Sequence, residues 1–274
     1  MTKILLDSAN IDEIKEIKDL GLLEGVTTNP NIIRMGFEKN VYQGDFLDYA
    51  KNLLEVTEDK PVFFQTMALK EKDIIKQAIY IYNQLSKYGN PVIKVPISTK
   101  CNENEGNYDG FRAIKELSKD NIPTLATAVV NPTQAYLASV AGAEYSAFIL
   151  RKFDEYIAKE LDIDLGLTDF FTDDKVKEIT YGKIEGRKDF LSGLGNLKKA
   201  KNIFKEHSLD TKLLVAGIRN SVQFSEVLEQ KVDYMTIPFP IFPLLFSHSA
   251  TTSFVTDTRD LAAKQYREFL YNNK

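Results

Sequence analysis

Cysteine and histidine, which supply many catalytic nucleophiles and metal ligands, are almost missing from this sequence. The 274 residues include one cysteine, Cys101, and two histidines, His207 and His248, which lie far apart in the chain. A single cysteine cannot form an internal disulfide, which fits a reducing compartment. Two distant histidines argue against a histidine-rich metal site, and they weaken a Ser-His-Asp or Cys-His hydrolase. We therefore expect a site that holds no metal ion.

Long apolar runs and an excess of positive charge are also missing. The N-terminal stretch MTKILLDSAN reaches an aspartate after a brief apolar run, so it resembles neither a secretory signal nor a membrane anchor. The apolar stretch 236–246 contains three prolines and is too short to span a bilayer. A formal net charge of −4 at pH 7 argues against nucleic acid or an anionic membrane as the main partner. The sequence predicts a cytoplasmic protein.

Eight short apolar segments recur along the chain and have the length and composition of β-strands. They occupy residues 3–9, 25–29, 61–67, 91–96, 124–129, 143–149, 212–217 and 234–238. Most show no polar alternation except near their C-terminal ends, as expected when both faces of a parallel sheet are covered.

The segments between these strands have helical apolar spacing, as at 11–20, 70–89, 110–120 and 131–142. This alternation predicts an α/β fold, a single (β/α)₈ TIM barrel over residues 1–274, with an open doubly wound sheet as the alternative. Two insertions extend the expected rim: an extended loop at 97–109, and an extra helix or excursion within 154–211. Residues 259–272 predict an amphipathic C-terminal helix that covers its own barrel or docks on a neighbouring subunit.

Polar residues collect at the C-terminal ends of the expected strands, where TIM barrels carry their chemistry. They are Asp7, Thr27, Asn29, Gln65, Lys94, Thr127, Arg219 and the segment from Phe148 to Arg151. Taken singly, each has a structural explanation: Asp7 or Asn29 could cap the following helix, and Gln65 could be a satisfied amide. Taken together, they would surround one amine with hydrogen-bonding groups.

That amine belongs to Lys94, which stands inside the apolar strand PVIKVP. Burying an ammonium group costs several kcal/mol unless it is paired or loses its proton. One interpretation is a lysine at a strand end, whose head reaches water or a carboxylate. The other is an amine kept neutral by its surroundings so that it can attack a carbonyl carbon.

Several motifs resemble one enzyme family. The N-terminal signature of the transaldolase and fructose-6-phosphate aldolase family resembles LDSANIDEIKEIKDLGLLEGVTTNPNII, with GVTTNP at its centre. The segment with that family's Schiff-base lysine resembles VIKVPIS, and the following segment resembles IPTLATAVVNPTQAYLASVAGAEY. Weaker similarity returns at LLVAGIRN and MTIPFPIF. The resemblance implies a class I mechanism without metal or cofactor, in which Lys94 attacks a ketose phosphate and forms an iminium ion.

The resemblance also implies roles for the residues around Lys94. Asp7 matches the aspartate that takes part in proton transfer during bond cleavage. Asn29 matches the asparagine that holds substrate hydroxyls, and Thr27 shares its strand face, which makes Thr27 a further substrate-binding candidate. Thr127 and Gln65 match the pair that positions a catalytic water.

The substrate phosphate would meet basic residues. Arg219 in GIRN falls where the family uses a basic residue for phosphate, and an arginine suits that task through its bidentate fork. The spacing from Phe148 to Arg151 resembles the transaldolase pattern, in which the arginine also meets phosphate. An alignment shifted by one residue would exchange the roles of Arg151 and Lys152. Gly217 stands where a phosphate-contacting serine is typical.

Two activities within the family remain open. A transaldolase transfers a three-carbon dihydroxyacetone unit to an aldose phosphate, whereas an aldolase protonates the enamine and releases dihydroxyacetone. Gln65 resembles the aldolase pattern and Phe148 the transaldolase pattern. We favour a transaldolase because an apolar ring cannot help to protonate the enamine. A sugar-phosphate-binding barrel without catalysis is a further alternative. Sugar phosphates are the expected partners, and smaller members of this family commonly form homo-oligomers.

Overall fold

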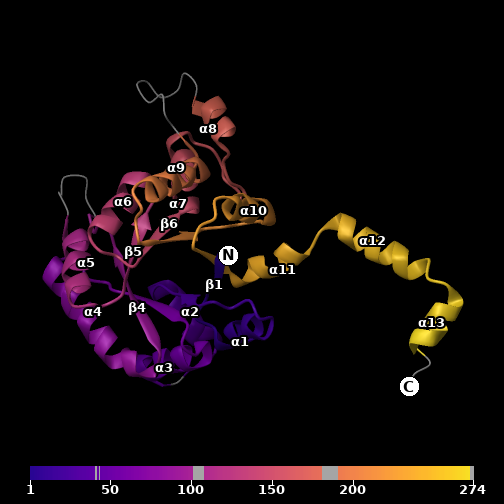
Figure 1. Ribbon diagram of the computed structural model, residues 1–274, viewed down its shortest axis with the longest axis horizontal. Helices are drawn as coiled ribbons and strands as arrows, with labels where there is room; N and C mark the ends of the chain where they lie inside the picture. The colour runs from indigo at the N-terminus through magenta and orange to yellow at the C-terminus, as the bar shows by residue number, and fades with distance from the viewer. Residues whose placement is uncertain (41, 43, 101–107, 181–190, 272–274) are drawn as a thin grey trace. The chain divides into compact units, whose positions relative to one another are not determined.

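The computed structural model describes residues 1–40, 42, 44–100, 108–180 and 191–271, and it separates into two compact units, 1–239 and 240–274. In the first unit, eight parallel strands close into a barrel in sequence order (Figure 1). The strands are β1 (Lys3–Asp7), β2 (Val26–Thr27), β3 (Pro61–Gln65), β4 (Asn90–Pro96), β5 (Thr124–Val129), β6 (Tyr145–Ile149), β7 (Lys212–Ala216) and β8 (Tyr234–Pro238). This closed sheet confirms the predicted TIM barrel and excludes the open sheet.

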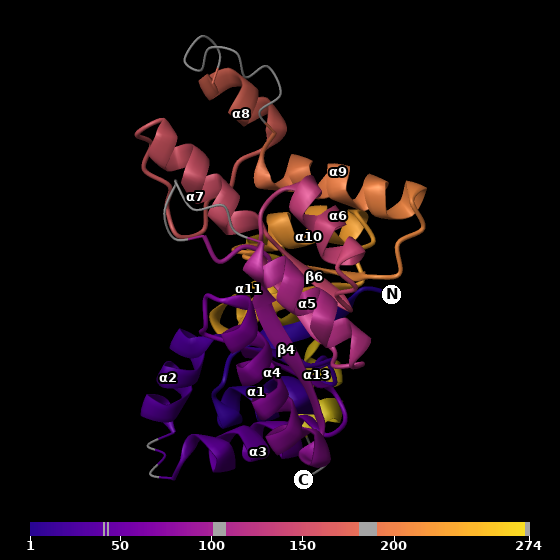
Figure 2. The ribbon, with the colours of Figure 1, turned by 90° about the vertical axis from the view of Figure 1, so that its left-hand side faces the viewer.

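Helices connect these strands and cover their outer faces (Figures 1 and 2). They are α1 (Ile11–Asp19), α2 (Pro30–Lys39), α3 (Phe46–Thr57), α4 (Glu71–Leu85), α5 (Asp109–Lys119), α6 (Pro132–Val140), α7 (Leu150–Glu160), α8 (Asp173–Thr180), α9 (Gly193–Glu206) and α10 (Ser221–Glu229), with a short 3₁₀ helix at Ser86–Tyr88. All eight predicted strands are present, but the strands predicted at 3–9, 25–29 and 61–67 end earlier than expected. The second of these ends early because Asn29 already caps α2 with its side chain.

An apolar layer fills the centre of the barrel. It consists of inward-facing residues from seven strands: Leu5, Phe63, Val92, Leu125, Tyr145, Ala147, Leu214 and Tyr234. Since side chains alternate along a strand, the residues two positions further toward the C-terminal ends also face inward. The apolar layer is therefore the floor on which the polar ends of the strands lie.

The predicted excursion within 154–211 is real and contains α8, between α7 and α9. In Figure 2, α9 lies beside α6 and α7, with which it makes contacts. The buried carboxylate of Asp154 joins the parts of the excursion, because it accepts hydrogen bonds from the amides of Gly193 and Phe171. Burial raises the pKa of Asp154 to about 6. Residues 181–190, and most of the expected loop at 97–109, lie outside the described residues.

The second unit consists of a 3₁₀ turn (Phe239–Ile241) at its junction with the barrel, followed by α11 (Phe242–Phe246), α12 (Ser249–Asp260) and α13 (Lys264–Tyr271). The prediction of one continuous helix at 259–272 is wrong, because α12 ends at Asp260 and α13 begins at Lys264. The guanidinium of Arg267 donates to the carbonyl oxygens of Arg259 and Asp260, and so caps the C-terminus of α12. The interpretation of residues 1–274 as one domain stays a prediction. No helix in the described parts of the chain is long and apolar enough to cross a membrane.

Candidate active site

A cavity of about 200 Å³ opens at the C-terminal ends of the strands. Fifteen residues line it, and they include seven of the nine predicted site residues: Asp7, Thr27, Asn29, Lys94, Thr127, Arg151 and Arg219. The remaining lining residues are Leu125, Ala147, Ile149, Lys152, Leu214, Ala216, Gly217 and Thr236. The barrel thus brings together residues that are more than 200 positions apart in the sequence.

The alternation of each strand explains why these side chains meet. Asp7 lies two residues beyond Leu5 on β1, and Lys94 lies two residues beyond Val92 on β4, so both point into the barrel above the apolar floor. Thr127 follows Leu125 on β5 in the same way. Just after it, β5 shifts register and Ala128 adopts a φ of 57°, an irregularity of the kind found next to active sites.

Two lysines line this cavity, Lys94 on β4 and Lys152 on α7. The amine of Lys94 donates a hydrogen bond of 3.1 Å to the carbonyl oxygen of Thr28. Burial lowers the pKa of Lys94 below its ordinary value of 10.5, and the nearby charge of Asp7 opposes this effect. The enclosed amine is therefore held closer to its neutral, nucleophilic form than a surface lysine would be.

The carboxyl group of Asp7 shows the opposite shift. Burial raises the pKa of Asp7, while the hydrogen bond from Thr27 and the charges of Lys94 and Arg219 act to lower it. Asp7 and Lys94 thus form a pair in which the surroundings favour the neutral form of both groups. A carboxyl group and an amine with shifted pKa values in one cavity are candidates for acid-base roles.

Thr27 and Thr236 support Asp7 from below. The hydroxyl of Thr27 donates to Asp7 Oδ1 at 2.7 Å, and the two threonine hydroxyls are 2.5 Å apart. Sequence reasoning missed Thr236. The available signal was one polar residue within the apolar strand YMTIP, two positions beyond the inward-facing Tyr234.

Asn29 combines a structural role with a place in the cavity wall. Its Oδ1 accepts hydrogen bonds from the amides of Asn31 and Ile32, both at 3.0 Å, and so caps α2. Because the cap uses the oxygen, the amide NH₂ is the part of Asn29 that could donate to a ligand.

Gln65 and Lys94 are partners in the register between β3 and β4. Gln65 faces inward like Phe63, two positions before it. It is partly buried and does not line the cavity, unlike Thr127. The structure therefore brings Gln65 next to the lysine strand but not into the cavity wall.

The structure does not bring Phe148 to the cavity. Ala147 and Ile149 line it, so Phe148 between them points to the opposite face of β6, where its side chain is fully buried against the helical layer. The structure therefore does not give Phe148 the place that the resemblance implied, because neighbouring residues of a strand point to opposite faces. Ile149 occupies the position that was assigned to Phe148.

Arg151 lines the cavity, but its guanidinium is engaged by the protein itself. Its guanidinium donates to the carbonyl oxygens of Gly166 and Asp169, both at 2.9 Å, and to that of Leu165 at 3.2 Å. Its Nε is 3.0 Å from a carboxylate oxygen of Glu155. The donors of Arg151 thus hold the loop 165–169, which leaves little capacity for a phosphate. Lys152 also lines the cavity, and its side chain is 65% exposed.

Gly217 brings β7 and the start of α7 close together. Its φ is +84°, and an added Cβ would lie 2.8 Å from the amide nitrogen of Arg151 and 2.9 Å from the Cβ of Arg151. A serine at this position would need both a left-handed backbone and a displaced neighbour. Glycine is therefore required here by the approach of two backbones, beside the cavity-lining Arg219.

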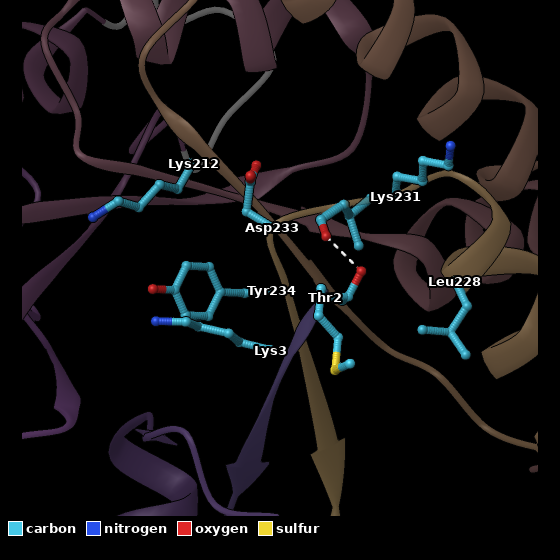
Figure 3. Close-up of a pocket in the computed structure, with 9 residues that line it drawn as sticks. Thr2, Lys3, Lys212, Leu228, Lys231, Asp233 and Tyr234 are labelled. Carbon is cyan, nitrogen blue, oxygen red and sulfur yellow. Dashed lines mark hydrogen bonds between the residues drawn. The ribbon is translucent and has the colours of Figure 1, made fainter.

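A larger cavity at the N-terminal ends of the strands is a weaker candidate (Figure 3). Lys3, Lys212 and Lys231 line it, but Lys231 points away from the other two amines in this view. Lys212 is paired with Glu144 at 2.8 Å, and Lys3 lies 3.9 Å from Glu24. The three amines do not converge on one point, so this cavity lacks a centre for chemistry.

Nothing in the described ranges of the chain groups three or more histidine, cysteine, aspartate or glutamate residues for a metal ion. The chemistry that this arrangement can perform is that of an enclosed amine beside a carboxyl group, with threonine, asparagine and arginine side chains around them.

Comparison with known proteins shows the family of this chain. The family model described as Transaldolase/Fructose-6-phosphate aldolase matches residues 4–273. The chain belongs to this family. A probable transaldolase of Thermoplasma volcanium is 30% identical over 256 residues, which cover 93% of this chain and 92% of the relative. A probable transaldolase of Thermodesulfovibrio yellowstonii is 30% identical over 253 residues, covering 91% and 92%. A third, from Leptospira biflexa, is 28% identical over 263 residues, covering 94% and 98%.

Membership of the transaldolase/fructose-6-phosphate aldolase family supports an enzyme of this class. In TIM barrels the active site lies at the C-terminal ends of the strands, which is where the cavity around Lys94 opens.

Replacement of Gly217 by alanine should destabilise the protein more than the same change at Gly21. Both glycines have a positive φ, but an added Cβ at Gly21 meets nothing within 4 Å. The backbone cost of roughly 1–2 kcal/mol is common to both variants. Displacement of Arg151 should add about 1–3 kcal/mol for Gly217→Ala alone. Urea unfolding of the two variants measures this difference, and equal losses would contradict the close approach described for Gly217.

Proposed function

We propose that this protein is a Schiff-base-forming transaldolase, which transfers a three-carbon dihydroxyacetone unit from a ketose phosphate to an aldose phosphate. The observation that carries the proposal is the amine of Lys94, enclosed above an apolar floor, with a lowered pKa and with the carboxyl group of Asp7 nearby. The proposed function extends the family membership to a defined activity.

The reaction begins with the neutral amine of Lys94. At an ordinary pKa of about 10.4, fewer than about one lysine in a thousand is neutral at pH 7, so burial increases the reactive fraction. The amine adds to the ketone carbon of the donor, and loss of water from the carbinolamine leaves an iminium ion. This cation accepts the electron pair of the neighbouring carbon-carbon bond when that bond breaks.

Asp7 handles the proton of the cleavage step. As the bond breaks, the hydroxyl group of the departing aldose phosphate loses its proton to the Asp7 carboxylate and becomes the aldehyde. The three-carbon enamine stays bound to Lys94. An acceptor aldehyde then forms a new carbon-carbon bond with the enamine and takes the proton back from Asp7, and hydrolysis of the new iminium ion releases the product.

The remaining cavity residues bind the substrate. Arg219 lines the cavity and its charge reaches Asp7, so it is well placed for the phosphate, with Lys152 as a second cation. The NH₂ group of Asn29 suits a substrate hydroxyl. Thr127, together with Gln65 at the register position of Lys94, suits the water that iminium formation releases and hydrolysis consumes.

Transfer rather than release is favoured by the side chain at position 149. The enamine survives until an acceptor arrives only if no nearby group protonates it, and Ile149 offers no proton where a phenol would offer one. Gln65 is the signal for the alternative, a fructose-6-phosphate aldolase that releases free dihydroxyacetone. A sugar-phosphate-binding barrel without turnover is the remaining alternative. We also propose, from the sequence, that the protein acts in the cytoplasm as a homo-oligomer.

Borohydride reduction should trap the donor on Lys94. Incubation with fructose 6-phosphate followed by reduction is expected to add a three-carbon or full-substrate mass to the intact protein, because a reduced imine cannot hydrolyse. Lys94→Met should remove the adduct completely, whereas Lys212→Met, at the cavity of the opposite end, should retain it. No adduct with any ketose phosphate donor would favour the binding barrel over the enzyme.

Replacement of Ile149 by tyrosine should shift the enzyme from transfer toward release. A phenol at this position could protonate the enamine, and a positioned general acid contributes on the order of 10²–10⁴-fold. We expect the ratio of free dihydroxyacetone to transfer product to rise by about tenfold or more, measured by coupled assays. Phe148→Tyr is the matched control, because its hydroxyl would point away from the cavity. An equal change in both variants would refute the assignment of Ile149.

A further inference from the structure

The two threonines beside Asp7 form a buried chain of hydroxyl groups. Thr27 is 3% exposed and Thr236 is 2% exposed, so neither hydroxyl is freely solvated. Thr27 lies opposite Asp7 in the register between β1 and β2, whereas Thr236 lies opposite Leu5 in the register between β1 and β8. Thr236 is thus paired with Leu5, the residue of the apolar floor that lies two positions before Asp7 on β1.

Counting protons gives this chain a direction. A threonine hydroxyl has one proton to donate and two lone pairs that can accept. Thr27 donates its only proton to Asp7 Oδ1 at 2.7 Å. When Asp7 is the carboxylate that accepts this proton, the contact of 2.5 Å between the two hydroxyl oxygens has Thr236 as the donor and Thr27 as the acceptor. The order is Thr236 to Thr27 to Asp7.

We propose that Thr236 is a positioning residue for the proposed transaldolase reaction, acting on Asp7 through the hydroxyl of Thr27. Its donated hydrogen bond keeps the Thr27 proton directed at Oδ1. Oδ1 therefore remains an acceptor, and Oδ2 is the oxygen that takes up and returns the substrate proton. This inference rests on the proposed function for its role in catalysis, but the hydrogen-bond chain itself does not.

The chain of hydroxyl groups from Thr236 through Thr27 also stabilises the ionised form of Asp7. Hydrogen bonds in series polarise one another, so a donor behind Thr27 strengthens the bond that Thr27 makes to the carboxylate. Lys94 on β4 and Arg219 after β7 are the charged groups that act on Asp7 from other elements, and both favour the carboxylate as well. Loss of the Thr236 hydroxyl should therefore raise the pKa of Asp7.

The test measures the pKa of Asp7 directly, in protein labelled with ¹³C at aspartate carboxyl carbons, with Asp7→Asn to assign the resonance. Thr236→Val removes the hydroxyl at nearly constant shape, and Thr236→Ser retains it. We expect an upward shift in the valine variant and none in the serine variant. In a Thr27→Val background, Thr236→Val should cause no further shift, because the hydroxyl acts only through Thr27. Equal pKa values in the wild type and Thr236→Val would overturn the proposal, as would a shift that persists without Thr27.

Kinetic measurements distinguish the role of Thr236 from the proposed transaldolase activity. For the active enzyme, Thr236→Val should lower kcat/KM about threefold and move the acidic limb of its pH profile to higher pH, while Thr236→Ser restores both. If borohydride traps an adduct but the limb does not move, the proposed function stands and the role of Thr236 falls. If the wild type forms no adduct while the carboxyl pKa shifts as expected, the hydrogen-bond chain stands and the transaldolase proposal falls.

Discussion

The amine of Lys94 lies between an apolar layer that disfavours its charge and a carboxyl group that favours it. The layer is built from the inward residues of seven strands, and the carboxyl group belongs to Asp7 on β1. Only a closed barrel holds the apolar layer and the carboxyl group near Lys94, because β1 and β4 are not neighbours in the sheet and their side chains meet across the barrel interior. The environment of the Lys94 amine therefore depends on closure of the barrel. Without closure, Lys94 would be an ordinary strand lysine.

Residues at the rim of the cavity combine two roles: they line the cavity, and they also stabilise the local backbone. Asn29 caps α2 with its oxygen and keeps its NH₂ group, and Gly217 permits β7 to approach Arg151. Arg151 itself fixes the loop 165–169, and Asn220 donates to the carbonyl oxygen of Thr168 in the same loop at 2.7 Å. The excursion after α7 is thus attached to the strand ends next to Arg219, on the side that we assign to the phosphate.

The strand pattern predicted the barrel, and the motif positions predicted seven of the fifteen residues that line the cavity. Continuous apolar segments identify strands of a covered parallel sheet, and residues at their C-terminal ends must meet once the sheet closes. The difference at Phe148 depends on strand alternation, since neighbouring residues of β6 face opposite sides and Ala147 and Ile149 take the cavity side. Ile149 therefore lines the cavity in place of Phe148, and Lys152 lines it beside Arg151.

Other features depend on contacts that no local pattern reveals. Thr236 matters because its hydroxyl meets that of Thr27, 209 residues earlier in the chain. The apolar spacing of 259–272 predicted one continuous helix, but α12 ends at Asp260 and Arg267 of α13 donates to the carbonyl oxygens of Arg259 and Asp260. In each case the interaction is a hydrogen bond made only after the chain has folded.

The most direct measurement for the central claim is the pKa of the Lys94 amine in the free protein. Heteronuclear NMR of protein with labelled lysine side chains would give it, with Lys94→Met to identify the resonance. Burial should place this pKa below the ordinary lysine value of 10.5, and Asp7→Asn should lower it further because the carboxylate opposes the shift. A resonance that titrates with the surface lysines, or one unaffected by loss of Asp7, would contradict the account.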